Sequence, residues 1–90
     1  MPSAVSDLTS IRNYIGQDNW EVANDVVMRI VEQAESLAIY PQKGRIGRIQ
    51  GSRESILPGL PYIIAYRPKQ DAVEIVRIIH TSRQWPKRIK

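Results

Sequence analysis

The apolar positions of the first forty residues recur at three- and four-residue spacing, which predicts two amphipathic helices. In residues 3–17 one helical face is formed by Val5, Leu8, Ile11 and Ile15. A second helix is predicted to begin at Asp18 or Asn19 and to run to about residue 39, because Asp18 and Glu21 have the spacing of a capping box. The short break between the two segments predicts an antiparallel helical hairpin.

The second predicted helix carries an apolar stripe that is wider than one contact needs. Its members are Val22, Ala23, Val26, Val27, Ile30, Val31, Ala34, Leu37 and Ala38. A helix with such a wide stripe packs against more than one neighbour. We therefore expect it to contact the first helix on one side and a sheet on the other.

The second half of the chain has a different pattern. Residues 40–52 are rich in glycine and basic side chains and are predicted to form a loop. Three segments rich in β-branched and aromatic residues predict strands at 53–57, 62–67 and 72–80. Their connections are short, which indicates an antiparallel meander. The predicted fold class is α+β: one domain over residues 1–90, with an N-terminal antiparallel helical hairpin packed on a C-terminal antiparallel sheet.

The composition is that of a soluble globular domain, with 42% hydrophobic and 24% charged residues. The absence of cysteine excludes disulfides, zinc fingers and cysteine nucleophiles. The longest apolar run, residues 62–66, is far too short to cross a bilayer, and the first residues do not form a secretory signal. We predict a cytoplasmic protein that does not act at a membrane and uses no metal or cofactor.

Charge divides the chain in two. Residues 1–40 hold two basic and six acidic side chains, a balance of −4, whereas residues 41–90 hold eleven basic and three acidic ones, a balance of +8. Such a split gives one part of the molecule an affinity for anions, either nucleic acid or an acidic protein. A solvated basic surface without a specific ligand is the plainer interpretation.

Several segments together resemble a known family. They are the opening Asp7-Leu8 with Ile11 and Tyr14-Ile15, the strand that begins Arg53-Glu54, the strand that closes on Tyr66-Arg67, and the final stretch Val73-Glu74-Ile75-Val76-Arg77-Ile78-Ile79-His80-Thr81-Ser82-Arg83-Gln84-Trp85-Pro86. In this order the chain resembles the RelE/ParE toxin superfamily of bacterial toxin–antitoxin systems, and most closely its ParE-like, plasmid-stabilisation branch. The resemblance implies a toxin that a cognate antitoxin holds inactive.

One departure from the family pattern concerns the first strand. Members usually begin with a β-strand, and Met1-Pro2-Ser3 leaves no room for one. A missing strand exposes backbone donors and acceptors on its neighbour, which an antitoxin strand or a second copy of the chain could fill. We therefore expect an exposed sheet edge and a route to homo-oligomers. An inactive homologue that serves only as a binding module is a further possibility.

The resemblance implies two alternative mechanisms. ParE-like toxins bind and inhibit DNA gyrase, which is the function predicted here. RelE-like toxins cleave mRNA on the ribosome, and the candidate catalytic residues for that reaction are Glu54, Arg67, Arg77, His80 and Arg83. The predicted target-binding residues are Arg67, Arg77, His80, Arg83 and Trp85. The predicted antitoxin-binding residues, on the second helix, are Val22, Val26, Ile30 and Leu37.

Each candidate also has a structural interpretation. Strict alternation puts Arg77 and His80 on opposite faces of the last strand, so the two converge only if that strand bulges or bends. His80 is then a hydrogen-bonding residue of the fold, and Glu54 an ion-pair partner of Arg67 or Arg77 rather than a base. Trp85 folds back over the core in the structural interpretation, and inserts into a partner or stacks on a base in the functional one.

Overall fold

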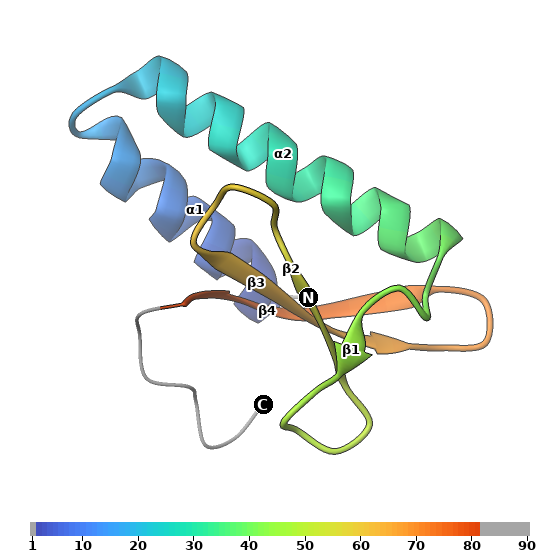
Figure 1. Ribbon diagram of the computed structural model, residues 1–90. Helices are drawn as coiled ribbons and strands as arrows, with labels where there is room; N and C mark the ends of the chain where they lie inside the picture. The colour runs from blue at the N-terminus through green and yellow to red at the C-terminus, as the bar shows by residue number, and fades with distance from the viewer. Residues whose placement is uncertain (1, 82–90) are drawn as a thin grey trace.

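The computed structural model describes residues 2–81, which form a helical hairpin on one side of a four-stranded sheet (Figure 1). The elements, in chain order, are α1 (Pro2–Gly16), α2 (Trp20–Ile39), β1 (Arg45–Ile46), β2 (Arg53–Ile56), β3 (Tyr62–Pro68) and β4 (Val73–His80). All strand pairs are antiparallel, in the order β1-β2-β3-β4. The predicted α+β architecture is confirmed.

The second helix is capped by Asn19. This residue has extended backbone angles (φ −156°, ψ 106°), and its side-chain oxygen accepts the backbone N–H of Val22 at 3.1 Å. Such a bond satisfies one of the amide donors that the first turn of a helix leaves unpaired. Of the two predicted starting residues, Asn19 is therefore the cap, and Glu21 lies in the first turn, where its charge favours the positive end of the helix dipole.

Strand β1 lies inside the segment that the sequence predicts to be a loop. It has only two residues, which pair with β2 as Arg45↔Glu54 and Ile46↔Arg53. Tyr66 of β3 fixes the loop before it: the tyrosine hydroxyl accepts the Gly44 N–H at 2.9 Å and donates to the Pro41 carbonyl at 2.8 Å. A Cβ on Gly44 would lie 2.6 Å from that hydroxyl, so the close approach requires glycine.

The core lies between the helices and the sheet. Its buried members are Val26, Ile30, Leu37, Leu57, Tyr62, Ile64, Tyr66 and Ile78, with Leu8, Ile11 and Ile15 of α1 packed against them. Both helices thus direct most of their apolar stripes toward the sheet, as the periodicity predicts. Val5 of the first stripe and Val22 of the second are exceptions, since both are exposed. Additional bonds join the layers: Arg29 donates to the Pro58 carbonyl at 2.8 Å, and Gln33 donates to the Ser55 hydroxyl at 2.8 Å.

Strand β4 contains a bulge that changes which residues share a face. The register places Ala65 opposite Arg77 and Tyr66 opposite Ile75, so Val76 is the extra residue. Ile75 and Ile78, three residues apart, consequently both pack on the core side. Strict alternation was therefore wrong for the first half of the strand. The bulge does not bring Arg77 and His80 together, since both follow it and still alternate.

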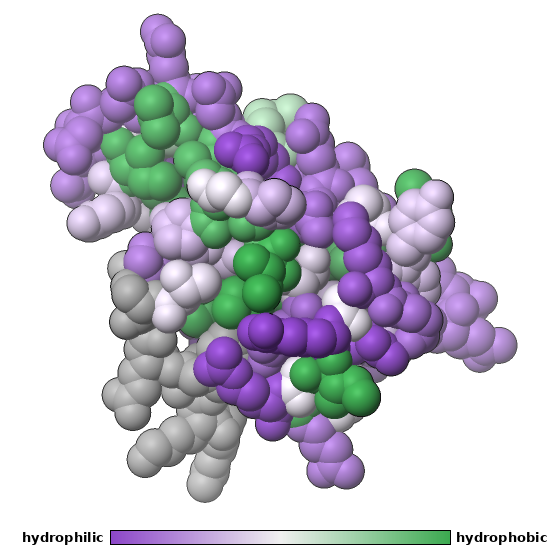
Figure 2. Space-filling model, viewed as in Figure 1, coloured by the Kyte–Doolittle hydropathy of each residue, from purple (hydrophilic) through white to green (hydrophobic). Residues whose placement is uncertain are grey.

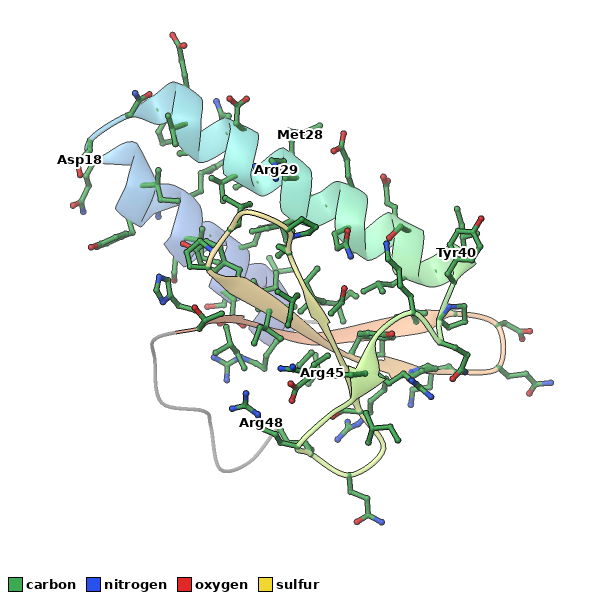
Figure 3. The ribbon with its side chains drawn as sticks, viewed as in Figure 1. Asp18, Met28, Arg29, Tyr40, Arg45 and Arg48 are labelled. Carbon is green, nitrogen blue, oxygen red and sulfur yellow. The ribbon has the colours of Figure 1, made fainter. Side chains whose placement is uncertain are left out.

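The outward side of α2 is acidic. Glu21, Asp25, Glu32 and Glu35 are exposed at three-, four- and seven-residue spacing, with Met28 between them on the side away from the sheet (Figure 3). The charge asymmetry of the sequence thus becomes a division between an acidic helical layer and a basic sheet. Within residues 2–81, no helix is long and apolar enough to cross a bilayer.

Candidate functional site

The face of the sheet opposite the helices carries a row of residues from all four strands. Arg45, Glu54, Ala65 and Arg77 lie directly opposite one another in the strand register. Ser55, the next residue on β2, bonds to Gln33 of α2, so the row that contains Glu54 points away from the helices. We call this surface the outer face. It presents arginines at both ends of one row.

The Glu54 carboxylate lies buried in the outer face, with only 2% of its side chain exposed. One oxygen accepts Arg45 Nη2 at 3.2 Å; the other accepts the backbone N–H of Arg48 at 3.0 Å and lies 3.6 Å from Arg48 Nε. Figure 3 shows both arginines on the side of the sheet away from the helices. A buried carboxylate needs such partners because desolvation penalises its charge. Glu54 is therefore ion-paired, with Arg45 and Arg48 rather than with Arg67 or Arg77.

Arg77 is held by Asp7 of α1. Its Nε and Nη2 donate to the two carboxylate oxygens at 2.7 and 3.0 Å, a bidentate pair, and the backbone N–H of Ile78 donates to the same carboxylate at 2.9 Å. The hydrogen bond to Asp7 raises the pKa of Arg77 above its ordinary value; burial lowers it, and the negative charge of Asp7 raises it further. These three bonds attach the first helix to the edge strand of the sheet.

His80 lies on the core side of β4, near the end of the strand. Its ring packs edge-on against Tyr62, with ring centres 5.3 Å apart and planes at 88°. The two rings help to line a cavity of about 330 Å³ between α1 and the sheet; the remaining lining residues are Asp7, Ser10, Ile11, Tyr14 and Ile78. His80 and Glu54 consequently lie on opposite faces of the sheet.

Arg67 occupies the outer face of β3, opposite Glu74 in the register. Glu74 is paired with Lys69 at 3.6 Å. In the part of the chain that the structure describes, Arg67 makes no hydrogen bond or ion pair, and its side chain is half-buried. It remains a candidate for contact with an anion.

Two predicted target-binding residues, Arg83 and Trp85, lie outside the described residues. Their assignment stays a prediction. Among residues 2–81, no group of three or more histidine, aspartate or glutamate side chains is arranged to hold a metal ion.

The four predicted antitoxin-binding residues divide into two classes. Val26, Ile30 and Leu37 are buried in the core, where they contact the sheet rather than solvent. Val22 is 45% exposed and lies near exposed Trp20 at the tip of the hairpin, where Figure 2 shows hydrophobic surface. Of the four, only Val22 is open to direct contact with a partner on the free chain.

Three residues that form the ion pairs of Glu54 and Arg77 were not among the candidate residues predicted from the sequence. Arg45 and Arg48 stand in the segment predicted to be a loop, where three basic residues among glycines were the available signal. Asp7 is an acidic residue beside the apolar stripe of α1, and Arg77 is a basic residue within an apolar strand. Their complementary charges indicated a pair, but seventy residues separate them along the chain.

Known proteins resemble this chain in both sequence and fold. The family model described as the ParE toxin of the type II toxin-antitoxin system, parDE, matches residues 1–85. A chain of the solved chromosomal ParDE TA system from P. aeruginosa superposes with a TM-score of 0.80 and 29% identity, covering 91% of each chain. The fold of that chain is therefore the fold of this one.

Curated relatives agree with the family model. A putative toxin, Y4kP of Sinorhizobium fredii, is 45% identical over 83 residues, which cover 92% of this chain and 85% of the relative. Toxin RelE2 of Caulobacter vibrioides is 40% identical over 80 residues, or 89% of each protein. Membership of this family implies an antitoxin as partner. The chain belongs to the ParE toxin family, within the RelE/ParE superfamily, and is the toxin component of a type II toxin–antitoxin system.

Proposed function

We propose that this toxin acts by binding and inhibiting DNA gyrase, and that its cognate antitoxin prevents this binding. The family match supports a ParE-like role. The alternative within the superfamily is ribosome-dependent cleavage of mRNA, and the name of the Caulobacter relative, Toxin RelE2, keeps it in consideration.

The observation that favours binding over cleavage is the separation of the candidate catalytic groups. RNA cleavage requires a base for the ribose hydroxyl, a cation for the phosphorane and an acid for the leaving oxygen, all around one phosphate. Glu54 is buried between two arginines on the outer face, and His80 packs on Tyr62 on the core face. Arg77 is engaged by Asp7. No single phosphate contacts these three groups in this arrangement.

Paired assays on the folded protein test the proposal. One follows supercoiling by gyrase, and the other follows mRNA in a translating extract. Loss of supercoiling with intact mRNA is the expected result. Cleaved mRNA with normal supercoiling would refute it and would make Glu54, Arg67, Arg77 and His80 the catalytic candidates, with Arg83 beyond the described residues. No effect in either assay would support the inactive binding module.

His80 separates the two mechanisms further. His80→Ala removes the only histidine, the side-chain type most often used as a general acid or base. Although His80 was a predicted target-binding residue, its ring packs on Tyr62 on the core side of β4. We therefore expect a gyrase-binding toxin to keep its inhibitory activity in this variant, provided that circular dichroism and the melting temperature show it folded. A nuclease loses cleavage by a factor of about 10²–10⁴, the usual contribution of a general acid or base.

We propose that the antitoxin contacts the tip of the helical hairpin at Val22 and Trp20. Val22→Asp places a charge on this apolar surface and is expected to weaken antitoxin binding while leaving stability nearly unchanged. Met28→Asp is the matched control, because Met28 is also exposed (57%, against 45% for Val22) but lies among the acidic residues on the outward side of α2. Loss of binding in both variants to the same extent, or in neither, contradicts this assignment.

Action in the cytoplasm, a role in plasmid stabilisation and self-association through a sheet edge stay predictions.

A further inference from the structure

Strand β3 is buried on both of its faces. The five residues 62–66 form an uninterrupted apolar run, and all of them are buried. Such a run is typical of a strand that is covered on both sides, whereas a strand with one solvated face alternates apolar and polar residues. The helices pack on the face that carries Tyr62, Ile64 and Tyr66. The outer face of β3 therefore needs a second cover.

The large apolar residues of the outer face form a row across three strands. Ile63 of β3 lies opposite Ile56 of β2 and Ile79 of β4 in the register. Ile63 and Ile79 are 5% and 6% exposed, yet neither belongs to the core cluster between the helices and the sheet. Ile56, at the β2 end, is 52% exposed. We call these three residues the outer row.

The cover of the outer row does not come from the helices. Among residues 2–81, both helices lie on the other side of the sheet (Figure 1). The arginines of the outer face are engaged in the neighbouring row, where Arg77 bonds to Asp7 of α1 and where Arg45 and Arg48 bond to Glu54. Ile63 and Ile79 are nevertheless buried in the single chain, so the cover belongs to the same polypeptide.

The chain leaves the sheet beside this row. The backbone N–H of Thr81 donates to the Pro61 carbonyl at 2.8 Å, which fixes the end of β4 directly after the outer row. Residues 82–90 lie outside the described residues, and their apolar members are Trp85, Pro86 and Ile89. The four residues from Thr81 to Trp85 span about 13 Å when extended. Adjacent strands are about 5 Å apart, so a reversal of the chain after Thr81 brings Trp85 within reach of all three isoleucines.

We propose that residues 82–90 dock on the outer face, with the indole of Trp85 packed over Ile63 and Ile79. A tryptophan buries about 150–250 Å², which suits it to cover two neighbouring isoleucines. The contact is apolar rather than ionic, because both the segment and the outer face are basic. This location would put Trp85 on the side of the sheet away from the core. The inference does not depend on gyrase as the target.

Tryptophan fluorescence tests the proposal in the full chain. Trp20→Phe leaves Trp85 as the one tryptophan of the sequence. Quenching of Trp85 by acrylamide is expected to be several-fold weaker in the folded chain than in the chain unfolded in urea. Since the contact is apolar, quenching should not change between about 0.1 M and about 1 M salt. It should also be independent of protein concentration, because the segment and the row belong to one chain.

Matched substitutions locate the contact. Ile56→Asp puts a charge at the exposed end of the outer row and should increase the quenching of Trp85. Ile46→Asp is the control, because Ile46 is 82% exposed and alternation along β1 points it to the opposite side from Arg45. This control should leave the quenching of Trp85 unchanged.

Thermal denaturation gives a second readout that does not need the Trp20→Phe variant. Trp85→Ala in the parent chain should lower the melting temperature by about 10–20 °C, because it removes the cover of the outer row. Tyr40→Ala, at an exposed aromatic residue, should lower it by less than about 4 °C.

Four outcomes would overturn the proposal. Equal quenching of Trp85 in the folded and unfolded chains would show that it is not covered. An equal response to Ile56→Asp and Ile46→Asp would place Trp85 away from the outer row. Protection that appears only as protein concentration rises would assign the cover to a second copy of the chain. A melting temperature as little changed by Trp85→Ala as by Tyr40→Ala would assign it to other residues. Supercoiling assays on the same variants report separately on gyrase inhibition.

Discussion

Both ends of the sheet's charged row are held by a carboxylate bound to arginine, but the two networks differ in what they leave exposed. At the β4 end, Asp7 of α1 binds Arg77 in a bidentate pair and also accepts the Ile78 N–H. At the β1 end, the carboxylate is the buried partner and the two arginines are exposed. The first network joins two elements and engages its arginine. The second presents its arginines to solvent.

This difference shows why an arginine on a functional face is not by itself a functional residue. Arg77 was a candidate in both mechanisms, yet its guanidinium bonds to a helix of its own chain. Arg45 and Arg48 were not candidates, yet they have the greater exposure. The orientation of the carboxylate partner separates the two cases, and substitutions in each network test the distinction.

Asp7→Ala should have the largest effect. The variant removes three hydrogen bonds, leaves Arg77 with an unpaired and partly desolvated charge, and frees the Ile78 amide. We expect a loss of about 2–3 kcal/mol in the free energy of unfolding, or a melting temperature lower by about 10–20 °C, measured by thermal denaturation. Asp18→Ala, at the exposed hairpin turn, is the control and should change stability by less than about 0.5 kcal/mol. A change as small as that for Asp7→Ala would make its pair an ordinary surface contact.

Tyr66→Phe tests how the loop before β1 is held. The variant removes the hydroxyl that accepts from Gly44 and donates to Pro41, and leaves the buried Gly44 N–H without its partner. We expect a loss of about 1–2 kcal/mol by chemical denaturation, with Tyr14→Phe, an exposed tyrosine, as the neutral control. Amide exchange should accelerate at Gly44 and at the β1–β2 pairs before other sites. Uniform acceleration across the sheet would argue against a local role.

The smaller stability effect is expected at Glu54. In Glu54→Gln the amide oxygen still accepts one bond, and the exposed arginines return to water, so no charge is left buried and unpaired. The loss should be about 0.5–1 kcal/mol, clearly below that of Asp7→Ala. A loss equal to or above that of Asp7→Ala would reverse the comparison and make the β1 end the stronger of the two networks.

No pH dependence is expected from Arg77 across the neutral and moderately alkaline range. Its pKa is raised in the folded chain, so its contribution is fully present below the unfolded pKa and is lost only as pH rises through the folded one. Both values lie far above pH 10. The stability difference between the parent and Arg77→Gln should therefore stay constant between about pH 7 and about pH 10. A difference that shrinks in this range would show that another group titrates with the pair.

Periodicity predicted the elements that have a repeating apolar pattern. Both helices and strands β2, β3 and β4 follow from residues spaced three to four or two apart, and the hairpin-on-sheet arrangement follows from their order. Strand β1 could not be predicted in this way, because two residues define no period and their pairing depends on β2 and on the Tyr66 hydroxyl. The bulge at Val76 likewise results from pairing between strands and has no signature within β4 itself.

The sequence predicted the candidate site less completely than it predicted the fold. Side-chain chemistry identified arginine, histidine and glutamate as the relevant residue types. It did not give the pairing of Asp7 with Arg77, because long-range contacts depend on which edge α1 covers. The sequence also predicted that Val26, Ile30 and Leu37 bind the antitoxin. They are instead buried in the core, because an apolar stripe that packs on both a helix and a sheet leaves few of its residues exposed.

The bond between Asp7 and Arg77 also constrains how the molecule folds. Helix α1 packs against β4, the last strand described, and residues 7 and 77 are bonded to each other. The contacts that close the domain therefore join residues far apart along the chain. Contacts of such sequence separation slow folding, and a chain emerging from the ribosome cannot make them until β4 has been synthesised. A nascent chain therefore cannot close its domain before residues 77 and 78 have left the ribosome, and any activity that needs the closed domain begins only after that point.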